Sequence, residues 1–258
     1  MAKIRLFLKI LMFLLIIGFA SNAILQEVSY YFYKGDRQVS DPIITPKKIE
    51  YTDKLTGYGH NLSLDSKAII LFFGGSGDIA YNCVAKYSLY YDVPFLAVDY
   101  YGTQDSQGKM DLSTMQKPAT DFFDYCKARY PSRKIVVTGH SYGCGMAAYL
   151  ASARDCDSLI LLAGYRDLSD LYNKIIPIFQ GPFKAFISDD IRVDQYAKQT
   201  VCPVTIVASQ ADNTLGADLQ EKVRRLYNGA KLLTFPDIDH GDYPTDKRVI
   251  ALIKEQLQ

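Results

Sequence analysis

Ser141 stands between two glycines in the pentapeptide Gly139-His140-Ser141-Tyr142-Gly143, which directly follows the β-branched segment 135–138. The residues after it, 144–151, are small and compatible with a helix. A serine at a sharp turn from a buried strand to a helix is typical of a nucleophile elbow. The glycines permit the strained turn that exposes the hydroxyl. Ser141 is therefore the candidate nucleophile.

A serine hydroxyl needs a base that takes its proton before it attacks. The chain has three histidines. His60 precedes the regular part of the sequence, and the side chain of His140 should leave the turn in a different direction from that of Ser141. His240 follows the last strand-like segment, in a loop at the same end of the sheet as the elbow. We predict that His240 is the base and that His140 has a packing role.

The base in turn needs a carboxylate that fixes its tautomer and stabilises the imidazolium. Asp212 is the best candidate, because it lies in the loop 209–214 directly after the apolar strand-like segment 204–208. Three aspartates lie closer to His240 in the sequence but share a tight loop with it, and we interpret them as turn and cap residues: Asp237, Asp239 and Asp242. No regular spacing organises this cluster, so we predict neither a metal site nor a cofactor.

A tetrahedral intermediate also needs donors for its oxyanion. The backbone N–H of Tyr142, the residue after the nucleophile, is the first predicted donor. The second is expected from the glycine-rich loop 74–78, where we select Gly75, with Ser76 as the next choice. This loop lacks the glycine spacing and the Gly-Lys-Ser/Thr ending of phosphate-binding loops.

The rest of the chain alternates between strand-like and helix-like segments. Nearly continuous apolar runs are typical of strands that are covered on both faces: 68–73, 93–98, 134–138, 158–163, 201–208 and 231–235. Helical patterns separate them: 79–91, 112–130, the elbow helix, 217–227 and 247–257. This alternation predicts an α/β fold with a mostly parallel sheet and helices on both faces. We expect one domain, residues 47–258, which begins with an antiparallel hairpin formed by 49–52 and 61–64 around Gly57-Tyr58-Gly59.

About forty residues interrupt this rhythm before Pro203. An insertion of that length over the carboxyl end of a sheet typically becomes a lid. We place a small lid at about residues 165–200, with an apolar set that either lines a substrate site or seals the lid onto the core: Leu171, Ile175, Ile176, Ile178, Phe179, Phe183 and Phe186.

The first 25 residues are of a different kind. Basic residues precede a long uncharged run, 10–26, and small residues follow at 20–23. Two interpretations are open: a cleaved signal peptide or an uncleaved signal anchor near the lower length limit of a membrane span. We favour the anchor, with residues 26–46 as a linker. In either case the basic end stays in the cytoplasm and the domain is extracytoplasmic, either tethered to the membrane or secreted.

Composition excludes several classes of protein. Hydrophobic residues make up 48% of the 258 residues, as in a globular protein with a sizeable core. The formal net charge is +1, without a dense basic block, so no nucleic-acid partner is predicted. The five cysteines are odd in number and widely spaced, which is typical of packed thiols rather than of a zinc site. One or two disulfides remain open, and the sequence does not pair them.

With its nucleophile, acid and base in the order Ser141, Asp212, His240, the chain resembles the α/β-hydrolase superfamily. More narrowly, it is similar to a membrane-anchored branch with serine-aminopeptidase-like and acyl-thioesterase-like members. The resemblance covers about residues 45–258, through the motifs at 45–49, 71–79 and 202–204. Phe73 stands where such proteins commonly carry a histidine, and Ala208-Ser209-Gln210 replaces the usual glycine before the acid. The resemblance implies hydrolysis of an ester, thioester or amide.

Two classes of function follow. The first is a serine hydrolase that cleaves an ester or thioester of an acyl or lipid-like substrate, such as a lipid or an acylated protein, with a peptidase as its main rival. The second is a catalytically silent hydrolase fold used for binding at the membrane, which the departures at Phe73 and Gln210 motivate. The oligomeric state is open.

Overall fold

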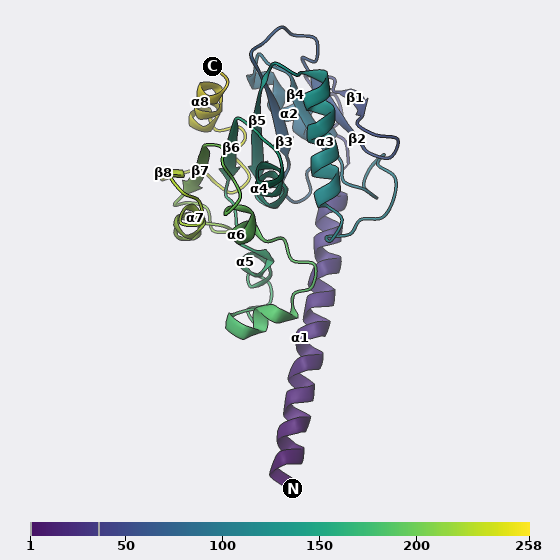
Figure 1. Ribbon diagram of the computed structural model, residues 1–258, viewed down its shortest axis with the longest axis vertical. Coiled ribbons are helices and arrows are strands. Elements are labelled where there is room, and N and C mark those ends of the chain that lie inside the picture. Colours follow the sequence, from purple (N-terminus) through teal and green to yellow (C-terminus); the bar gives the residue numbers. More distant parts are fainter. Residues whose placement is uncertain (1, 36) are drawn as a thin grey trace.

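One twisted sheet organises the protein in a computed structural model that describes residues 2–35 and 37–258. Met1 of the predicted anchor and Asp36 of the predicted linker lie outside the described residues. Within this part of the chain the sheet has eight strands in the order β1-β2-β4-β3-β5-β6-β7-β8, and all pairs except β1–β2 and β2–β4 are parallel. Figure 1 shows helices before and behind this sheet. The predicted α/β architecture is confirmed.

The strands fall close to the apolar runs of the sequence. Their bounds are β1 Lys47–Glu50, β2 Thr56–His60, β3 Ala68–Phe73, β4 Phe95–Val98, β5 Lys134–His140, β6 Ser158–Leu162, β7 Val204–Ser209 and β8 Lys231–Phe235. Every residue of β3, β4, β6 and β7 is buried, as expected for strands with helices on both sides.

The helices follow the predicted segments with shorter ends. Their bounds are α1 Ala2–Lys34, α2 Ala80–Tyr87, η1 Ser88–Tyr90, α3 Gln116–Arg129, α4 Gly143–Ala153, α5 Leu168–Tyr172, η2 Gly181–Phe186, α6 Val193–Tyr196, α7 Ala217–Arg224 and α8 Lys247–Gln256. Neighbouring residues of β3 reach opposite faces of the sheet. The ring of Phe72 contacts Tyr87 of α2, whereas the ring of Phe73 contacts Phe122 of α3.

The edge hairpin differs in detail from the prediction. It is antiparallel, but its second strand is β2, which contains Gly57 and Gly59, rather than the segment 61–64. A Cβ atom on Gly57 would lie 2.2 Å from the carbonyl oxygen of Ala97 in the next strand. The glycines therefore permit close strand pairing here instead of forming the turn.

The N-terminal helix also differs from the prediction, because α1 continues to Lys34 through the first part of the expected linker. Its last turns pack on the domain. Leu25 is buried, and the ring of Tyr33 lies edge-on to Tyr100 and Tyr142 at 5.5 and 5.2 Å between centroids. The expected linker thus begins as helix, held against the domain by these contacts.

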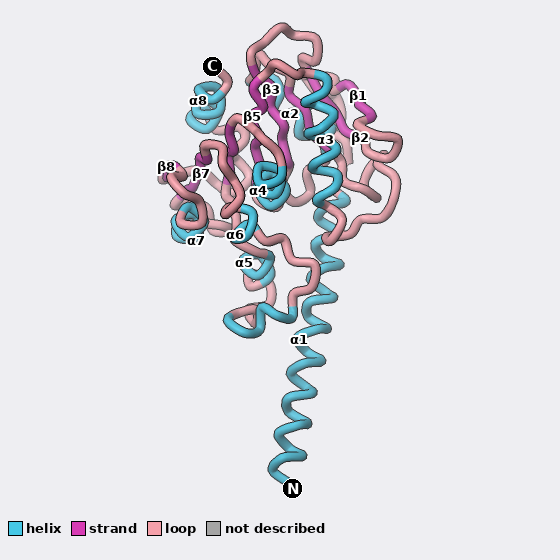
Figure 2. The backbone as a smooth tube through the Cα atoms, in the orientation of Figure 1, coloured by secondary structure: helices cyan, strands magenta, loops and turns pink. Residues whose placement is uncertain are grey.

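Residues 163–203 form the insertion where a lid is expected. It contains the short elements α5, η2 and α6, and it projects from the sheet along α1 (Figure 2). Leu171 and Phe179 of the apolar set are buried, whereas Ile175 and Phe183 are 54% and 49% exposed. Part of the set seals the insertion onto the core, and part faces outwards.

Asp99 makes stability depend on pH. Burial raises the pKa of its carboxyl to about 7; Oδ1 accepts the Ala80 N–H at 2.8 Å, while Oδ2 has no partner among the described residues. The folded-state pKa lies above the unfolded value, so the folded protein binds this proton more tightly. The stability that the proton contributes is complete below pH 4 and is lost as the pH rises to about 7.

Asp99→Asn should therefore raise the free energy of unfolding by about 2–3 kcal/mol more at pH 8 than at pH 5. Urea titrations at the two pH values measure this difference. An equal effect at both would contradict it.

Candidate active site

Ser141 occupies a strained turn between β5 and α4. Its φ angle is 50°, in the left-handed region that non-glycine residues rarely adopt. Hydrogen bonds hold the turn on both sides. The Ser141 N–H donates to the Leu162 carbonyl at 2.9 Å, and the Cys144 N–H donates to the Ser141 carbonyl at 3.0 Å. This is the geometry expected of a nucleophile elbow.

The flanking glycines are required by close packing. A Cβ atom on Gly143 would lie 2.2 Å from the carbonyl oxygen of Phe73, at the end of β3. On Gly139 it would lie 2.7 Å from the Cβ atom of Ala147 in α4. The elbow is thus pressed against the glycine-rich loop that follows β3, and larger residues would push the two apart.

The structure brings the three residues predicted for catalysis together. His240 Nε2 lies 2.9 Å from Ser141 Oγ, and His240 Nδ1 lies 2.9 Å from Asp212 Oδ2. Each residue follows a different strand: Ser141 follows β5, Asp212 follows β7 and His240 follows β8. The carboxyl ends of parallel strands meet at one edge of the sheet, which explains why residues 71 and 99 positions apart in the chain are neighbours.

Asp212 is held as an anion in a fixed orientation. Its side chain is fully buried, and its Oδ1 atom accepts the N–H groups of Thr214 and Leu215 at 2.8 and 2.9 Å. Burial alone raises the pKa of this carboxyl, but the hydrogen bonds from His240 and from these two amides outweigh it, and the pKa lies below its ordinary value. The ionised carboxylate fixes the His240 tautomer with Nδ1–H, which leaves Nε2 free to accept the serine proton.

Sequence reasoning missed Tyr243. Its buried hydroxyl donates to Asp212 Oδ2 at 3.2 Å, beside the bond from His240. Burial and the adjacent carboxylate raise the pKa of the Tyr243 hydroxyl above its ordinary value, so it remains a donor. Its position three residues after the histidine carried no recognisable signal.

His140 packs against the base rather than against the nucleophile. Its Nε2 lies 2.8 Å from the His240 carbonyl oxygen and therefore donates to it, and the two imidazole rings lie 5.4 Å apart. Burial, with the neighbouring His240, lowers the pKa of His140 to about 4, so the ring is neutral at physiological pH. The predicted packing role is thus extended, because this hydrogen bond anchors the loop that carries His240.

The two residues predicted as oxyanion donors differ in whether their backbone N–H groups already have an acceptor. Among the described residues, none accepts the Tyr142 N–H, which begins α4 beside Ser141. Gly75 also lies against the elbow, since a Cβ atom on it would be 3.4 Å from the Ser141 Cβ atom. Its N–H, however, donates to Asp78 Oδ2 at 2.9 Å. As the loop stands, this donor is engaged by a carboxylate that sequence reasoning did not consider.

The end of α1 packs against residues beside the nucleophile. The rings of Phe32 and Tyr33 lie 6.0 and 5.2 Å from that of Tyr142, and the Gly77 N–H donates to the Phe32 carbonyl at 2.9 Å. Ser141 is only 4% exposed. In the described part of the chain, no group of three or more His, Cys, Asp or Glu side chains is arranged to hold a metal ion.

Because Ser141 is strained, we predict that glycine is more stable than alanine at this position, the reverse of the order within a helix. A left-handed conformation costs an L-residue about 1–2 kcal/mol, and glycine avoids this cost but gains about 0.4–1 kcal/mol of unfolded-chain entropy. We therefore expect Ser141→Gly to be more stable than Ser141→Ala by roughly 0.5–1 kcal/mol. At Thr120 in α3, a matched helical control, the alanine variant should be the more stable one. Thermal unfolding of the four variants checks this order, and alanine above glycine at both positions would contradict it.

Comparisons with known proteins concern the fold and the family of the chain. A model of the alpha/beta hydrolase fold family matches residues 67–196. A lysophosphatidylserine lipase, ABHD12, from Xenopus tropicalis is 31% identical over 151 residues, which are 52% of this chain and 38% of that protein. The chain thus matches well under half the length of this relative.

Solved structures share the fold at low sequence identity. The Pyrococcus furiosus esterase Pf2001 superposes with a TM-score of 0.62 at 16% identity, covering 87% of this chain and 100% of the other. Est1E from Butyrivibrio proteoclasticus, solved with ferulic acid bound, has a TM-score of 0.59 at 17% identity, covering 81% and 96%. At these identities the likeness concerns the fold.

Proposed function

Because this chain belongs to the α/β-hydrolase family, we propose that it is a serine hydrolase that cleaves a carboxylic ester or thioester of an acyl or lipid-like substrate. The observation that carries the proposal is the continuous chain of hydrogen bonds Asp212–His240–Ser141, with 2.9 Å at each link. Such a relay activates a serine for attack on an acyl carbon.

In the proposed reaction, Ser141 Oγ attacks the carbonyl carbon while His240 Nε2 accepts its proton. Asp212 stabilises the imidazolium that forms. His240 then gives the proton to the leaving alcohol or thiol, which leaves an acyl group on Ser141. His240 Nε2 then takes a proton from a water molecule, which attacks the acyl-enzyme, and returns this proton to Ser141 Oγ as the carboxylic acid leaves.

The proposed oxyanion donors are the N–H groups of Tyr142 and Gly75. The Tyr142 N–H is available as the site stands, whereas the Gly75 N–H must first leave Asp78 Oδ2. The negatively charged oxygen of the intermediate is chemically similar to the carboxylate oxygen that it would replace. We therefore propose that the oxyanion displaces Asp78 from Gly75 during the reaction.

An acyl lipid is the proposed substrate class. Two features support it: the name of the relative ABHD12, a lysophosphatidylserine lipase, and the apolar lid beside α1. By length and composition, one helix in the described part of the chain, Lys3–Lys34, is apolar enough to cross a membrane. We propose that it remains as an anchor, with Lys3, Arg5 and Lys9 on the cytoplasmic side and the hydrolase domain on the other.

Turnover by the purified full-length protein tests the function. We expect hydrolysis of acyl esters and thioesters, with weaker or no cleavage of aminoacyl amides. Cleavage of the amides alone would replace the esterase with a peptidase. An absence of turnover on every member of the panel, with a folded protein, would favour the silent binding fold.

A further inference from the structure

The lid element η2 packs against the middle of α1. The ring of Phe186 lies 5.3 Å from that of Phe19, edge to face. A Cβ atom on Gly18 would lie 2.5 Å from the same Phe186 ring, so the absence of a side chain at Gly18 permits the contact. In Figure 1, η2 is the unlabelled pale green helical turn beside α1, beyond α5 on the side away from the sheet. The lid thus accompanies the anchor helix far outside the body of the domain.

Between the two elements lies an apolar groove of about 610 Å³. Leu14, Ile17 and Gly18 of α1 form one wall. Ile178, Phe183 and Phe186 of the lid contribute to the other. The volume falls within the range of ligand pockets that hold small molecules, about 300–1,000 Å³.

The position of this groove along α1 indicates what surrounds it. Gly18 is nine residues from Lys9 and nine from Glu27, the two charges that flank the uncharged run 10–26. At 1.5 Å per residue, each charge lies about 13 Å from the groove, and the distance between them, about 27 Å, is close to the thickness of bilayer hydrocarbon, about 30 Å. If α1 spans the membrane, the groove opens to lipid chains rather than to water.

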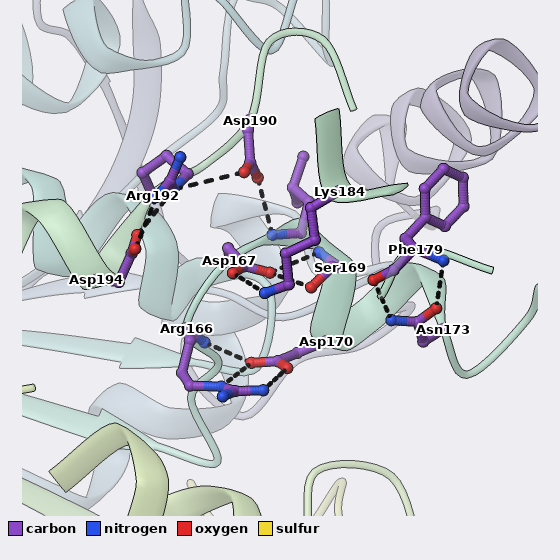
Figure 3. Close-up of polar contacts among 11 residues, drawn as sticks. Arg166, Asp167, Ser169, Asp170, Asn173, Phe179, Lys184, Asp190, Arg192 and Asp194 are labelled. Carbon is purple, nitrogen blue, oxygen red and sulfur yellow. Dashed lines mark hydrogen bonds and ion pairs between the residues drawn. The ribbon is translucent and has the colours of Figure 1, made fainter. Parts of the chain in front are cut away.

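Most of the charged side chains of the lid are paired. Figure 3 shows three ion pairs: Lys184 with Asp167 at 2.5 Å, Arg166 with Asp170 at 2.6 Å, and Arg192 with Asp194 at 2.7 Å. The exposed residues Lys174, Asp189 and Lys198 lie outside these pairs. Asp167 also accepts the Ser169 N–H at the start of α5, and Asp190 accepts the Leu168 N–H. Pairing lowers the cost of charge in a medium of low dielectric constant. The pair Lys184–Asp167 also ties η2 to α5, so that its apolar side is left to face α1.

We propose that the groove between α1 and η2 binds a hydrocarbon chain of a membrane lipid, and that η2 enters the hydrocarbon region of the bilayer. The inference rests on the proposed anchoring of α1, and it adds a chain-binding subsite to the proposed hydrolase. The other end of the same helix packs through Phe32 and Tyr33 against Tyr142, the residue after the nucleophile. A lipid chain held at Gly18 therefore lies along the helix that leads to the nucleophile.

Tryptophan fluorescence tests the location of η2, because the chain contains no tryptophan. Phe183→Trp places a single fluorophore on the 49% exposed lid residue, and Leu89→Trp places one at a residue of η1 that is 41% exposed on the domain. In phosphatidylcholine vesicles whose acyl chains are brominated near their middle, Phe183→Trp should lose at least half of its emission and Leu89→Trp should be unaffected. Equal behaviour of the two variants on vesicle-bound protein would overturn the inference. Flotation of the vesicles reports separately whether the protein is anchored at all.

A matched pair of substitutions tests the groove itself. Ile17→Trp fills the groove, whereas Ile16→Trp makes the same change at a neighbouring residue of α1 that is 58% exposed and does not line it. We expect the ratio of kcat/KM for a long-chain lysophospholipid in vesicles to kcat/KM for a soluble butyrate ester to fall about tenfold, or 1.4 kcal/mol, in Ile17→Trp only. The same ratio in both variants would overturn the inference. Loss of wild-type turnover on both substrates would instead reject the proposed hydrolase.

Cys156 and Cys202 lie close together, with their Sγ atoms 3.1 Å apart. They precede β6 and β7, which are paired strands, at the edge of the sheet opposite Ser141. The other three cysteines are buried singly, whereas Cys202 is partly exposed. The hydrogen bond from Cys156 lowers the pKa of the Cys202 thiol, which favours its thiolate.

We infer that Cys156 and Cys202 form a disulfide when the chain meets a small-molecule disulfide. The Cys202 thiolate attacks one sulfur of that oxidant and releases one thiol; Cys156 then attacks the mixed disulfide at the Cys202 sulfur, forms the Cys156–Cys202 bond and releases the second thiol. Each cysteine loses one proton, and the oxidant takes up both electrons.

Incubation of the full chain with oxidised glutathione tests this pairing. Of the five thiols, three should remain reactive in denaturant, and a non-reducing peptide map should link Cys156 to Cys202. The melting temperature should rise by roughly 10 °C, because the bond closes a long loop in the unfolded chain. Cys156→Ser should stop at the mixed disulfide, so that it loses one of its four thiols and carries one bound glutathione, and the control Cys83→Ser should still lose two. Five reactive thiols in the oxidised wild type, or a different linkage, would overturn the inference.

Discussion

Ser141→Ala should lower kcat on an acyl ester by roughly 10⁵–10⁶-fold, because it removes the atom that forms the acyl-enzyme while leaving the rest of the site in place. The same change should abolish covalent labelling by a fluorophosphonate probe, which reacts with an activated serine. Gel fluorescence of the labelled protein and steady-state kinetics measure the two effects.

The control for this prediction is Ser152→Ala. Ser152 lies in α4, eleven residues after the nucleophile, and its hydroxyl donates to the backbone carbonyl of Tyr149. It should label and turn over like the wild type. Labelling that survives Ser141→Ala would show that another residue is the nucleophile, and the proposed reaction would have to be abandoned.

Asp212→Asn should lower kcat by about 10⁴-fold with little change in KM. An amide at this position can donate a hydrogen bond to His240 Nδ1 and so stabilise the tautomer with Nε2–H, which cannot accept the proton of Ser141. It also loses the charge that stabilises the imidazolium. The side chain of Asp212 is fully buried and accepts the N–H groups of Thr214 and Leu215, so water cannot replace the lost charge in the variant.

Asp239→Asn makes the same chemical change within one residue of the base. Asp239 is exposed, whereas Asp212 is 4% exposed. We expect Asp239→Asn to retain activity within about twofold, as surface changes usually do. If it were as damaging as Asp212→Asn, the assignment of the acid would be wrong.

The sheet and the geometry that joins Ser141, Asp212 and His240 were predictable for one physical reason. Strands buried on both faces must be continuously apolar, so β3, β5 and β7 are visible in the sequence as runs of hydrophobic residues. The direction of a parallel sheet then places the residues that follow each run at the same edge. The local order of elements was therefore enough to find residues that are far apart in the chain.

Other features depend on contacts that the local pattern does not contain. Gly57 and Gly59 resemble turn residues, yet the backbone of β4 approaches them so closely that they pair as a strand. Residues 26–34 were predicted as the start of a linker, but they continue α1, and Tyr33 contacts Tyr100 and Tyr142, far along the chain.

In the site, too, features that depend on neighbouring residues were predicted, whereas features that depend on distant contacts were not. The elbow is a local motif and was recognised from five residues. The bond from Tyr243 to Asp212 and the bond from Gly75 to Asp78 depend on how loops close over one another. Neither the spacing nor the type of these residues predicts the two hydrogen bonds.

The continuity of α1 has a geometric consequence. A single rigid helix joins the level of Gly18 to the rings that touch Tyr142, about 22 Å further along its axis. If the charged residues on either side of its uncharged run lie at the two faces of a bilayer, such a helix would hold the nucleophile at a constant height above the membrane. Only molecules that rise from the same leaflet by that height would meet Ser141. A flexible tether of equal length would instead let the domain sample soluble substrates in all directions.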